Sequence, residues 1–385
     1  MNILIISREL PPVGGGAGHV ALHLAETLAA NGHNLFLITM HFGDLPLFEK
    51  RGALSIYRLR CGRKNQDSSY FIEMLRFLIV GQSLAKKIAK KERCQVIHAH
   101  AIVPDGIIAW VVHRHLHRPF VITAHGSDVP GYNPDQFRFS HTLIRPLWKR
   151  VVDAASALVT PSYHLGRLIR ITRPNRSTQT IANGISNKFC QTRERNAGFL
   201  IVSRLVQRKN YHIFLKALRH VRKPQVVNIV GEGPMMAELK AIANNLPQHE
   251  VIFHGWLDNE SDEWRALYES NQFFVLPSAS ENFPISLLEA GLAGLMILTT
   301  KLPGHIELLG DDAVYFESTD ESEISRTLSD VLSKGSEDWD GMTDRLKNRI
   351  ANRYSWHQIA KQYTELYLSI SEAGSATPEN PKSLV

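Results

Sequence analysis

The chain has 385 residues, of which 44% are hydrophobic and 21% are charged, so it is too long for one ordinary core and too apolar for a disordered chain. Three scattered cysteines exclude a disulfide framework and favour a reducing compartment. The net charge of +7 allows an anionic substrate or a membrane surface, and the sequence shows no nucleic-acid-binding signature.

Short apolar runs rich in β-branched residues alternate with longer helical patterns along the whole chain. The expected strands are NILIIS, LFLIT, LSIYRL, QVIHAH, FVIT, ALVT, TQTIA, FLIVS, VVNIV, VIFHG, FFVLP, LMILTT and AVYF. The clearest helical patterns cover residues 18–30, 70–91, 210–222, 234–244 and 284–293. This alternation predicts βαβ units and mostly parallel sheets.

The sequence predicts neither a signal peptide nor a membrane-spanning helix. The opening run has no basic segment before it and is soon followed by Pro11 and Pro12, so we interpret it as a first strand rather than a signal peptide. No apolar run approaches the roughly 18 residues of a spanning helix.

The alternation falters in the polar stretch at 182–198 and then resumes. We therefore expect an α/β protein with two doubly wound, Rossmann-like domains, residues 1–186 and 187–355, which face each other across a ligand-binding cleft. An aromatic, amphipathic helix at 356–372 is expected to pack back on the first domain, and residues 373–385 to form a flexible tail.

A glycine-rich segment, RELPPVGGGAGHV, follows the first strand. Gly15 and Gly16 let the backbone approach a ligand, and the helix expected to begin near Gly18 directs free N–H groups at it. The spacing is not GxGxxG, and no acidic residue stands about twenty positions on to hold a ribose, so a dinucleotide site is disfavoured. A ligand-binding loop and a plain turn both remain open.

Several histidines of the first half invite a functional interpretation. His125, in TAHGSDVP, follows a strand in a loop that can present its imidazole to a ligand, although a structural role is equally open. Two histidine clusters have alternate spacing: His98 with His100, and His113 with His115 and His117. Arginines flank the second cluster and oppose cation binding, so we expect no metal site.

An acidic DxD motif also exists, but in an unsuitable place. Asp338 and Asp340 lie in what we expect to be a late loop flanked by glycine and serine, rather than after a strand. A metal–diphosphate role is therefore disfavoured.

Strand ends of the second half carry cations and glycines. Arg204 directly follows FLIVS, and Lys209 comes five residues later, so the two cations either converge on an anion such as a diphosphate or form a solvated basic loop. Later strand ends carry Gly231, Gly233, His254 and Gly255. The backbone there either contacts a flat base or sugar or only forms a turn.

Two carboxylates stand in the otherwise apolar stretch SASENFPISLLEAG. Glu281 lies in the loop after FFVLP, and Glu289 lies in the helix that follows. Because a carboxylate among apolar side chains needs hydrogen-bond donors, we expect ribose hydroxyls or a structural arginine beside Glu289. The helix N-terminus near Glu281 offers N–H groups to phosphate.

These motifs, taken in order, resemble the retaining GT-B glycosyltransferases of family 4, also called group 1. The resemblance covers roughly residues 1–370. It rests on Glu281 and Glu289, on Arg204 and Lys209 in SRLVQRKN, on GEGP and HG, and on PPVGGGAGHV, VIHAHAIVPDG, TAHGSDV and IANGIS in the first half.

The resemblance implies transfer of a sugar, with retention, from a nucleotide-diphosphate sugar to a saccharide or lipid-linked acceptor in cell-surface glycan biosynthesis. UDP is expected rather than GDP, and neither a metal nor another cofactor is expected. The implied catalytic residues are His125 near the donor sugar, Glu281 facing that sugar, and Arg204 and Lys209 on the diphosphate. Glu289 would hold the ribose.

The remaining donor-binding residues follow from the same resemblance: Gly15, Gly16, Gly231, Gly233, His254, Gly255, Asn282, Phe283, Pro284 and Ile285. Asn282 and Pro284 stand where the family often has glycine, and Pro284 also removes a backbone donor. The alternatives are another GT-B enzyme, such as a nucleotide-sugar epimerase or a phosphorylase, and a non-catalytic nucleotide-sugar-binding protein.

Membrane contact is a separate hypothesis. The segment at 68–94 is apolar first and then carries five cations, and residues 138–150 are basic, so both could rest on an anionic leaflet. A core helix with a solvated end explains the first segment equally well. We expect a cytoplasmic protein that is peripheral at the cytoplasmic face of the membrane.

Overall fold

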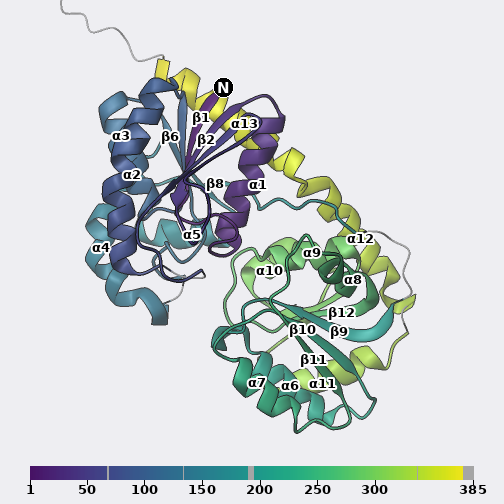
Figure 1. Ribbon diagram of the computed structural model, residues 1–385. Coiled ribbons are helices and arrows are strands. Elements are labelled where there is room, and N and C mark those ends of the chain that lie inside the picture. The colour runs from purple at the N-terminus through teal and green to yellow at the C-terminus, as the bar shows by residue number, and fades with distance from the viewer. Residues whose placement is uncertain (67–68, 133, 190–194, 336, 376–385) are drawn as a thin grey trace, which may run out of the picture. The chain divides into compact units, whose positions relative to one another are not determined.

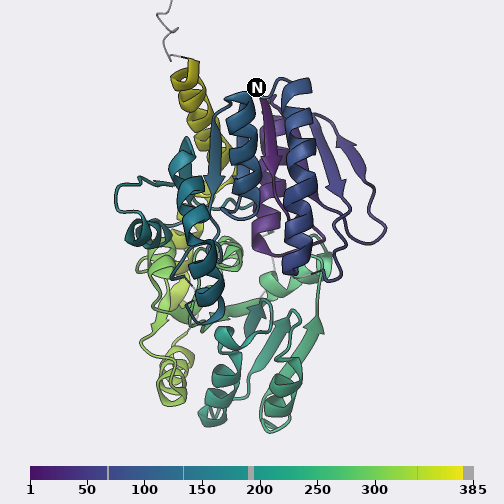
Figure 2. The same cartoon turned by 90° about the vertical axis from the view of Figure 1, so that its left-hand side faces the viewer.

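The computed structural model describes residues 1–66, 69–132, 134–189, 195–335 and 337–375 (Figures 1 and 2). The chain forms two compact units, each with its own sheet, which is mostly parallel in unit 1 and wholly parallel in unit 2. Unit 1 comprises Met1–Gly184 and Trp356–Val385, and unit 2 comprises Ile185–Ser355. Most of the tail predicted at 373–385 lies outside the described residues.

The sheet of unit 1 has eight strands in the order β3-β4-β2-β1-β5-β6-β7-β8. Their bounds are β1 Asn2–Ile6, β2 Asn34–Met40, β3 Phe48–Arg51, β4 Leu54–Leu59, β5 Val96–His100, β6 Phe120–Thr123, β7 Ala157–Thr160 and β8 Gln179–Thr180. The chain adds strands outward from β1 on one side through β2 and then, starting at β5, on the other side. The carboxyl edge of β1 and β5 is therefore the switch point where doubly wound sheets bind ligands.

Helices cover both faces of this sheet. They are α1 Gly16–Ala30, α2 Phe71–Lys91, α3 Asp105–Leu116, α4 Pro134–Ala154, α5 Tyr163–Thr172 and α13 Trp356–Ser375. Figure 1 shows α2, α3 and α4 on one face and α1 with α13 on the other. The strands between them read as almost continuous apolar runs because both faces are buried.

The C-terminal helix α13 packs on unit 1, as expected from its aromatic sequence. The hydroxyl of Tyr367 lies 2.7 Å from Nδ1 of His98, and the hydroxyl of Tyr363 lies 2.8 Å from that of Thr123. Nε2 of His98 lies 2.8 Å from the same threonine hydroxyl. These buried hydrogen bonds join the last helix to β5 and β6.

The sheet of unit 2 has six parallel strands in the order β11-β10-β9-β12-β13-β14. Their bounds are β9 Asn196–Val202, β10 Val226–Val230, β11 Glu250–Gly255, β12 Asn271–Leu276, β13 Met296–Thr300 and β14 Val314–Phe316. Here the switch point lies between β9 and β12.

The helical elements of unit 2 connect these strands. They are η1 Gln207–Lys209, α6 Tyr211–Ala217, η2 Leu218–His220, α7 Met236–Ala243, α8 Asp262–Ser270, α9 Ile285–Ala293, α10 Pro303–Leu309, α11 Glu321–Leu332 and α12 Glu337–Arg353. Asp338 and Asp340 stand in the first turn of α12, so the loop predicted for them was wrong. Both side chains are exposed, and acidic residues suit a helix N-terminus electrostatically.

Two further expectations concern thiols and membrane spans. Cys61 and Cys94 are buried free thiols, and Cys190 lies outside the described residues. Within the described parts of the chain, none of the helices has both the length and the apolar character needed to cross a bilayer.

Candidate active site

A buried ion-pair cluster occupies the switch point of unit 2. Nζ of Lys209, at the end of η1, lies 2.5 Å from Oε1 of Glu281, in the loop after β12. A guanidinium nitrogen of Arg208 lies 3.1 Å from the same oxygen. Burial alone would raise the pKa of Glu281, but Lys209 and Arg208 hold it below the usual range. Glu281 is therefore ionised at neutral pH.

Arg208 was not among the predicted site residues, whereas Arg204 was. The structure brings Lys209 and Arg208 to Glu281, while the side chain of Arg204 is exposed to solvent. The loops themselves are joined, because the backbone N–H of Ala279 donates to the carbonyl of Arg208 at 2.8 Å. The sequence shows that Arg208 is a cation next to Lys209, and this could have suggested a role for it. The sequence does not show the turn η1, which directs the Arg208 side chain toward Glu281.

The loop that carries Glu281 leads into α9. Pro284 is the N-cap of this helix, and Ile285 is its first residue, so the missing N–H of proline falls outside the helix. Asn282 and Phe283 are buried, and the Phe283 ring lies 5.6 Å from that of Tyr354. The first N–H groups of α9 consequently begin one residue after Pro284, close in sequence to the ion-pair cluster.

Glu289 stands one turn into α9 in a different environment. The hydroxyl of Tyr268, in α8, donates a hydrogen bond of 2.9 Å to Oε2 of Glu289. Burial raises the pKa of Glu289 to about 7, although Tyr268 and Lys188 oppose that rise. The sequence predicted ribose or an arginine as the hydrogen-bond donor to Glu289, and the structure shows instead the buried Tyr268, which no sequence motif marks.

The loops after β9, β10 and β11 pack so closely that two glycines are required. Gly231 and Gly233 have φ of +123° and +157°, and a Cβ on them would lie 1.9 and 2.3 Å from the carbonyl oxygens of Ser203 and Leu205. The N–H of Gly231 also donates to the carbonyl of Gly255 at 2.6 Å. These glycines thus have a structural reason to be there beside any ligand contact.

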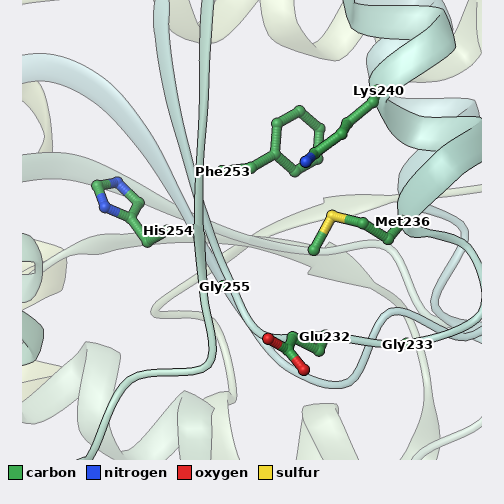
Figure 3. A pocket seen from close by; sticks show the side chains of 7 residues that line it. All are labelled: Glu232, Gly233, Met236, Lys240, Phe253, His254 and Gly255. Atoms are coloured by element: carbon green, nitrogen blue, oxygen red, sulfur yellow. The ribbon is translucent and has the colours of Figure 1, made fainter.

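A pocket of about 500 Å³ opens beside these loops. Its lining comprises Glu232, Gly233, Met236, Lys240, Phe253, His254 and Gly255. Figure 3 shows Met236 and Lys240 reaching from α7 toward Phe253 of β11, while the ring of His254 points to the other side of that strand. There Nε2 of His254 lies 2.9 Å from Oδ1 of Asn228. The pocket therefore offers an apolar wall, backbone polar groups and one charge of each sign.

The glycine-rich loop of unit 1 lies at that unit's switch point. Helix α1 begins at Gly16, two residues before the expected start, and Gly15 is its N-cap. The N–H of Gly15 donates to a carboxylate oxygen of Glu9 at 3.3 Å. A Cβ on Gly15 would meet no atom within 4 Å, so internal packing does not require glycine there. Open space beside a helix N-terminus is what ligand approach needs.

His125 stands in the loop after β6 and is held from two directions. Its Nε2 lies 3.2 Å from Nδ1 of His100 at the end of β5. Asp128 accepts the backbone N–H groups of His125 at 3.1 Å and of Gly126 at 3.0 Å, and its other oxygen accepts that of Ile102 at 2.8 Å. Burial lowers the pKa of His125, which keeps its imidazole neutral.

Four of the five histidines in the two predicted clusters have side-chain hydrogen-bond partners within the protein. His98 and His100 contact Tyr367, Thr123 and His125, while His113 and His115 contact the backbone carbonyls of Arg118 and Val111. In the described ranges, no three His, Cys, Asp or Glu side chains are grouped as a metal-ligand set.

Two Rossmann-like units with ligand-type loops at both switch points define the GT-B class of glycosyltransferases. The family model for glycosyl transferases group 1 matches residues 187–353, and that for Glycosyltransferase Family 4 matches residues 14–189. The chain belongs to this family of group 1, family 4 glycosyltransferases.

Similar proteins cover nearly the whole chain. An uncharacterized glycosyltransferase of Methanocaldococcus jannaschii is 25% identical over 95% of this chain and 98% of its own. The N-acetyl-alpha-D-glucosaminyl L-malate synthase of Bacillus anthracis is 23% identical, with 93% and 95% covered.

Solved structures agree on the fold. Sucrose-phosphate synthase from Thermosynechococcus elongatus has a TM-score of 0.80 at 19% identity, covering 97% of this chain and 100% of that one. Anabaena HepE in complex with UDP and glucose has a TM-score of 0.72 at 17% identity, with 96% and 100% covered.

Proposed function

We propose that this glycosyltransferase moves a sugar, with retention and without a metal, from a UDP-sugar to a saccharide or lipid-linked acceptor in cell-surface glycan biosynthesis. The observation that carries the proposal is the cluster of Lys209, Arg208 and Glu281 beside the N-terminus of α9. It concentrates cations and free N–H groups at a switch point, where a diphosphate leaving group needs them.

The donor is assigned to unit 2 in three parts. The base enters the pocket beside Gly233 and Gly255. The pocket volume of about 500 Å³ suits a small ligand. Glu289 accepts the ribose hydroxyls, and Lys209 with Arg204 binds the diphosphate. UDP is favoured over GDP because HepE, a structural relative, has been solved with UDP and with UDP-glucose.

The proposed chemistry depends on electrostatics. The glycosidic bond of the donor breaks through an oxocarbenium-like state while negative charge develops on the nucleotide diphosphate. Lys209 and the N–H groups of α9 stabilise that charge, and Glu281 holds Lys209 in place while it faces the sugar. His125 and the loop of Gly15 and Gly16 in unit 1 are assigned to sugar hydroxyls and to phosphate or acceptor contacts.

The first experiment is a thermal-shift screen of sugar nucleotides, since a true donor raises the melting temperature by mass action. Turnover with the best donor is then compared in Lys209→Ala, Glu281→Gln and the control Lys223→Ala, whose side chain is exposed. We expect Lys209→Ala to lose about 100-fold or more in kcat and the control to lose nothing.

The outcomes separate the alternative functions. Full turnover in both site variants would show that the site is assigned wrongly. Donor binding without any turnover would identify a non-catalytic binding protein. Conversion of the sugar nucleotide in the absence of an acceptor, with the nucleotide still attached to an altered sugar, would identify an epimerase.

A further inference from the structure

Helix α2 has an apolar outer face. Its inner side packs in the core of unit 1 through Phe77 and Ala85, which are fully buried. On the outer side, Phe71 is 74% exposed and Ile79 is 62% exposed. Ile72, Leu75 and Val80 are exposed as well. A surface helix normally turns polar residues outward, so this half of α2 does not behave as a core helix with a solvated end.

The same helix continues into a basic half. Lys86, Lys87, Lys90 and Lys91 follow the apolar turns, and Arg76 lies among them. The only acidic residue of α2 is Glu73, which is buried and accepts the N–H groups of Tyr70 at 2.8 Å and Lys64 at 3.1 Å. The outer face of the helix therefore combines exposed apolar side chains with cations and presents no carboxylate of its own.

The apolar end of α2 is tied to the glycine-rich loop of unit 1. The carbonyl of Gln66 accepts the N–H of Gly14 at 2.8 Å, and the Gln66 side chain donates to the carbonyl of Pro12 at 2.6 Å. The guanidinium of Arg63 fixes this segment by donating to the carbonyls of Asn65 and Gln66. The start of α2 thus lies at the same sheet edge as the loop of Gly15 and Gly16.

We propose that the outer face of α2, defined by Phe71, Ile72, Leu75, Ile79, Val80 and the lysines at 86–91, docks unit 1 on an anionic lipid surface. Apolar side chains enter the boundary between headgroups and acyl chains, and the lysines contact anionic headgroups. Docking in this way holds the glycine-rich loop beside the bilayer. The inference deepens the proposed function, because an acceptor anchored in that bilayer would be lipid-linked.

The charge pattern favours a lipid surface over a second copy of the chain. Two copies that met through this face would bring together cations from both helices. Lys91 is paired with Glu92, the C-cap residue, at 3.0 Å, but α2 presents no exposed carboxylate to neutralise Lys86, Lys87 and Lys90. An anionic leaflet accepts both parts of the face at once. Figure 2 turns the layer of α2, α3 and α4 toward the viewer, and among the described residues of unit 1 no helix or strand covers this layer from outside.

The test is flotation of the full chain with phosphatidylcholine vesicles that contain either no phosphatidylglycerol or about one third of it. We expect binding to the anionic vesicles only, and a marked loss at high salt. Ile79→Asp should weaken vesicle partitioning by about tenfold or more, since it removes an inserted apolar group and adds a repelled charge. Lys87→Gln with Lys90→Gln should abolish the preference for anionic vesicles.

A matched control is Ile171→Asp, because Ile171 lies on α5 and is 77% exposed. It should bind vesicles as the unchanged protein does. The donor-induced thermal shift should persist in all variants, which separates failure of docking from failure of the proposed function. Equal flotation with and without anionic lipid, or undiminished binding by Ile79→Asp, would overturn the inference. So would an oligomer in lipid-free solution that Ile79→Asp dissociates, since it would assign the face to a second copy.

Discussion

Glu281 and Glu289 lie on one loop and helix but in opposite electrostatic environments. Lys209 and Arg208 lower the pKa of Glu281, whereas burial raises that of Glu289 to about 7. Pairs of carboxylates with separated pKa values often divide two tasks in a site. In the proposed function, the ionised Glu281 would position Lys209 and Arg208 for a diphosphate, and Glu289 would accept hydrogen bonds from ribose hydroxyls.

Donor binding should strengthen as pH rises from 6 to 8. The groups that act on Glu289 are Tyr268 and Lys188, which lower its pKa, and Glu260, which raises it. Because ribose hydroxyls donate to the ionised carboxylate, binding should be up to about tenfold weaker at pH 6. Calorimetric titration with UDP-glucose measures this, since its diphosphate does not titrate in that range. Glu289→Gln should bind weakly and lose the pH dependence; an unchanged dependence would contradict the assignment.

Tyr268→Phe should shift that pH dependence to higher pH. The variant keeps the ring packing but removes the hydroxyl that donates to Glu289 at 2.9 Å, so the carboxylate loses a group that favours its charged form. Tyr211→Phe is the matched control, because this buried hydroxyl contacts Ser203 instead. A shift of equal size in both variants would mean that general packing, not the hydrogen bond, sets the midpoint.

The apo protein should gain stability from Glu289→Gln at pH 8 but not at pH 5. In the folded state the pKa of Glu289 is about 7, above its ordinary value of 4.5. The folded protein therefore binds this proton more tightly, and the resulting stability is present at low pH and lost as pH rises to about 7. Removing the charge should raise the free energy of unfolding by about 1–2 kcal/mol at pH 8. Thermal melts at the two pH values test this.

The site was predictable from the sequence to the level of strand ends, but not to the level of side-chain partners. The motifs pointed to Lys209, Glu281 and Glu289, and the structure places Lys209 and Glu281 together and Glu289 in the helix after them. Arg208 and Tyr268 were not predicted, because both contacts depend on tertiary packing. The direction of the Arg208 side chain is set by a short 3-10 turn, and Tyr268 reaches Glu289 through the contact between two helices. Sequence spacing also does not show that Gly231 and Gly233 are needed for packing, because neighbouring loops leave no room for a Cβ at either position.

At the scale of elements, the dominant feature is the return of α13 to the first sheet. Tyr363 and Tyr367 are buried and reach Thr123 and His98 through hydrogen bonds of 2.8 and 2.7 Å. A buried polar group that loses its partner costs more than the bond itself contributes. The hydrogen bonds between α13 and strands β5 and β6 therefore stabilise unit 1 as well as completing its fold.

Tyr367→Phe should lower the free energy of unfolding by about 1–3 kcal/mol, because it leaves a ring nitrogen of His98 without its partner inside the core. Leu368→Ala, at a neighbouring exposed position, should change stability much less. Chemical denaturation of both variants gives the comparison. Equal effects would show that the helix is held by general apolar contact and not by this hydrogen bond.

Sequence periodicity identified the elements well because buried parallel strands produce uniform apolar runs. Every expected strand corresponds to one in the structure, and the alternation gave the parallel sheets. It missed β3, whose sequence FEKR is polar and mostly exposed at the sheet edge, where pairing with β4 is antiparallel. It also placed a loop where α12 begins, since Gly335 and the flanking serines look like a turn.

At the scale of the whole molecule, the two units differ in how the chain builds them. Unit 2 is one continuous stretch, Ile185–Ser355, and unit 1 is completed by a segment from the far end of the sequence. Continuous domains with their own cores can fold alone. Unit 1 cannot be complete until Trp356 and the rest of α13 have been synthesised, and Trp356 itself packs where a Cβ on Gly184 would lie only 2.4 Å from its ring.

A fragment of residues 185–355 should therefore fold and bind the donor, whereas residues 1–184 alone should not fold stably. Without α13, the surface that buries Ile359, Tyr363 and Tyr367 would be open to water. Circular dichroism melts and UDP titration of the 185–355 fragment test the first half. Adding residues 356–375 to the 1–184 fragment, as a separate chain or by fusion after a flexible linker, should restore cooperative unfolding. A stable 1–184 fragment would show that the core of unit 1 does not need α13. A 185–355 fragment that folds but binds no nucleotide would show that unit 2 alone does not contain the donor site.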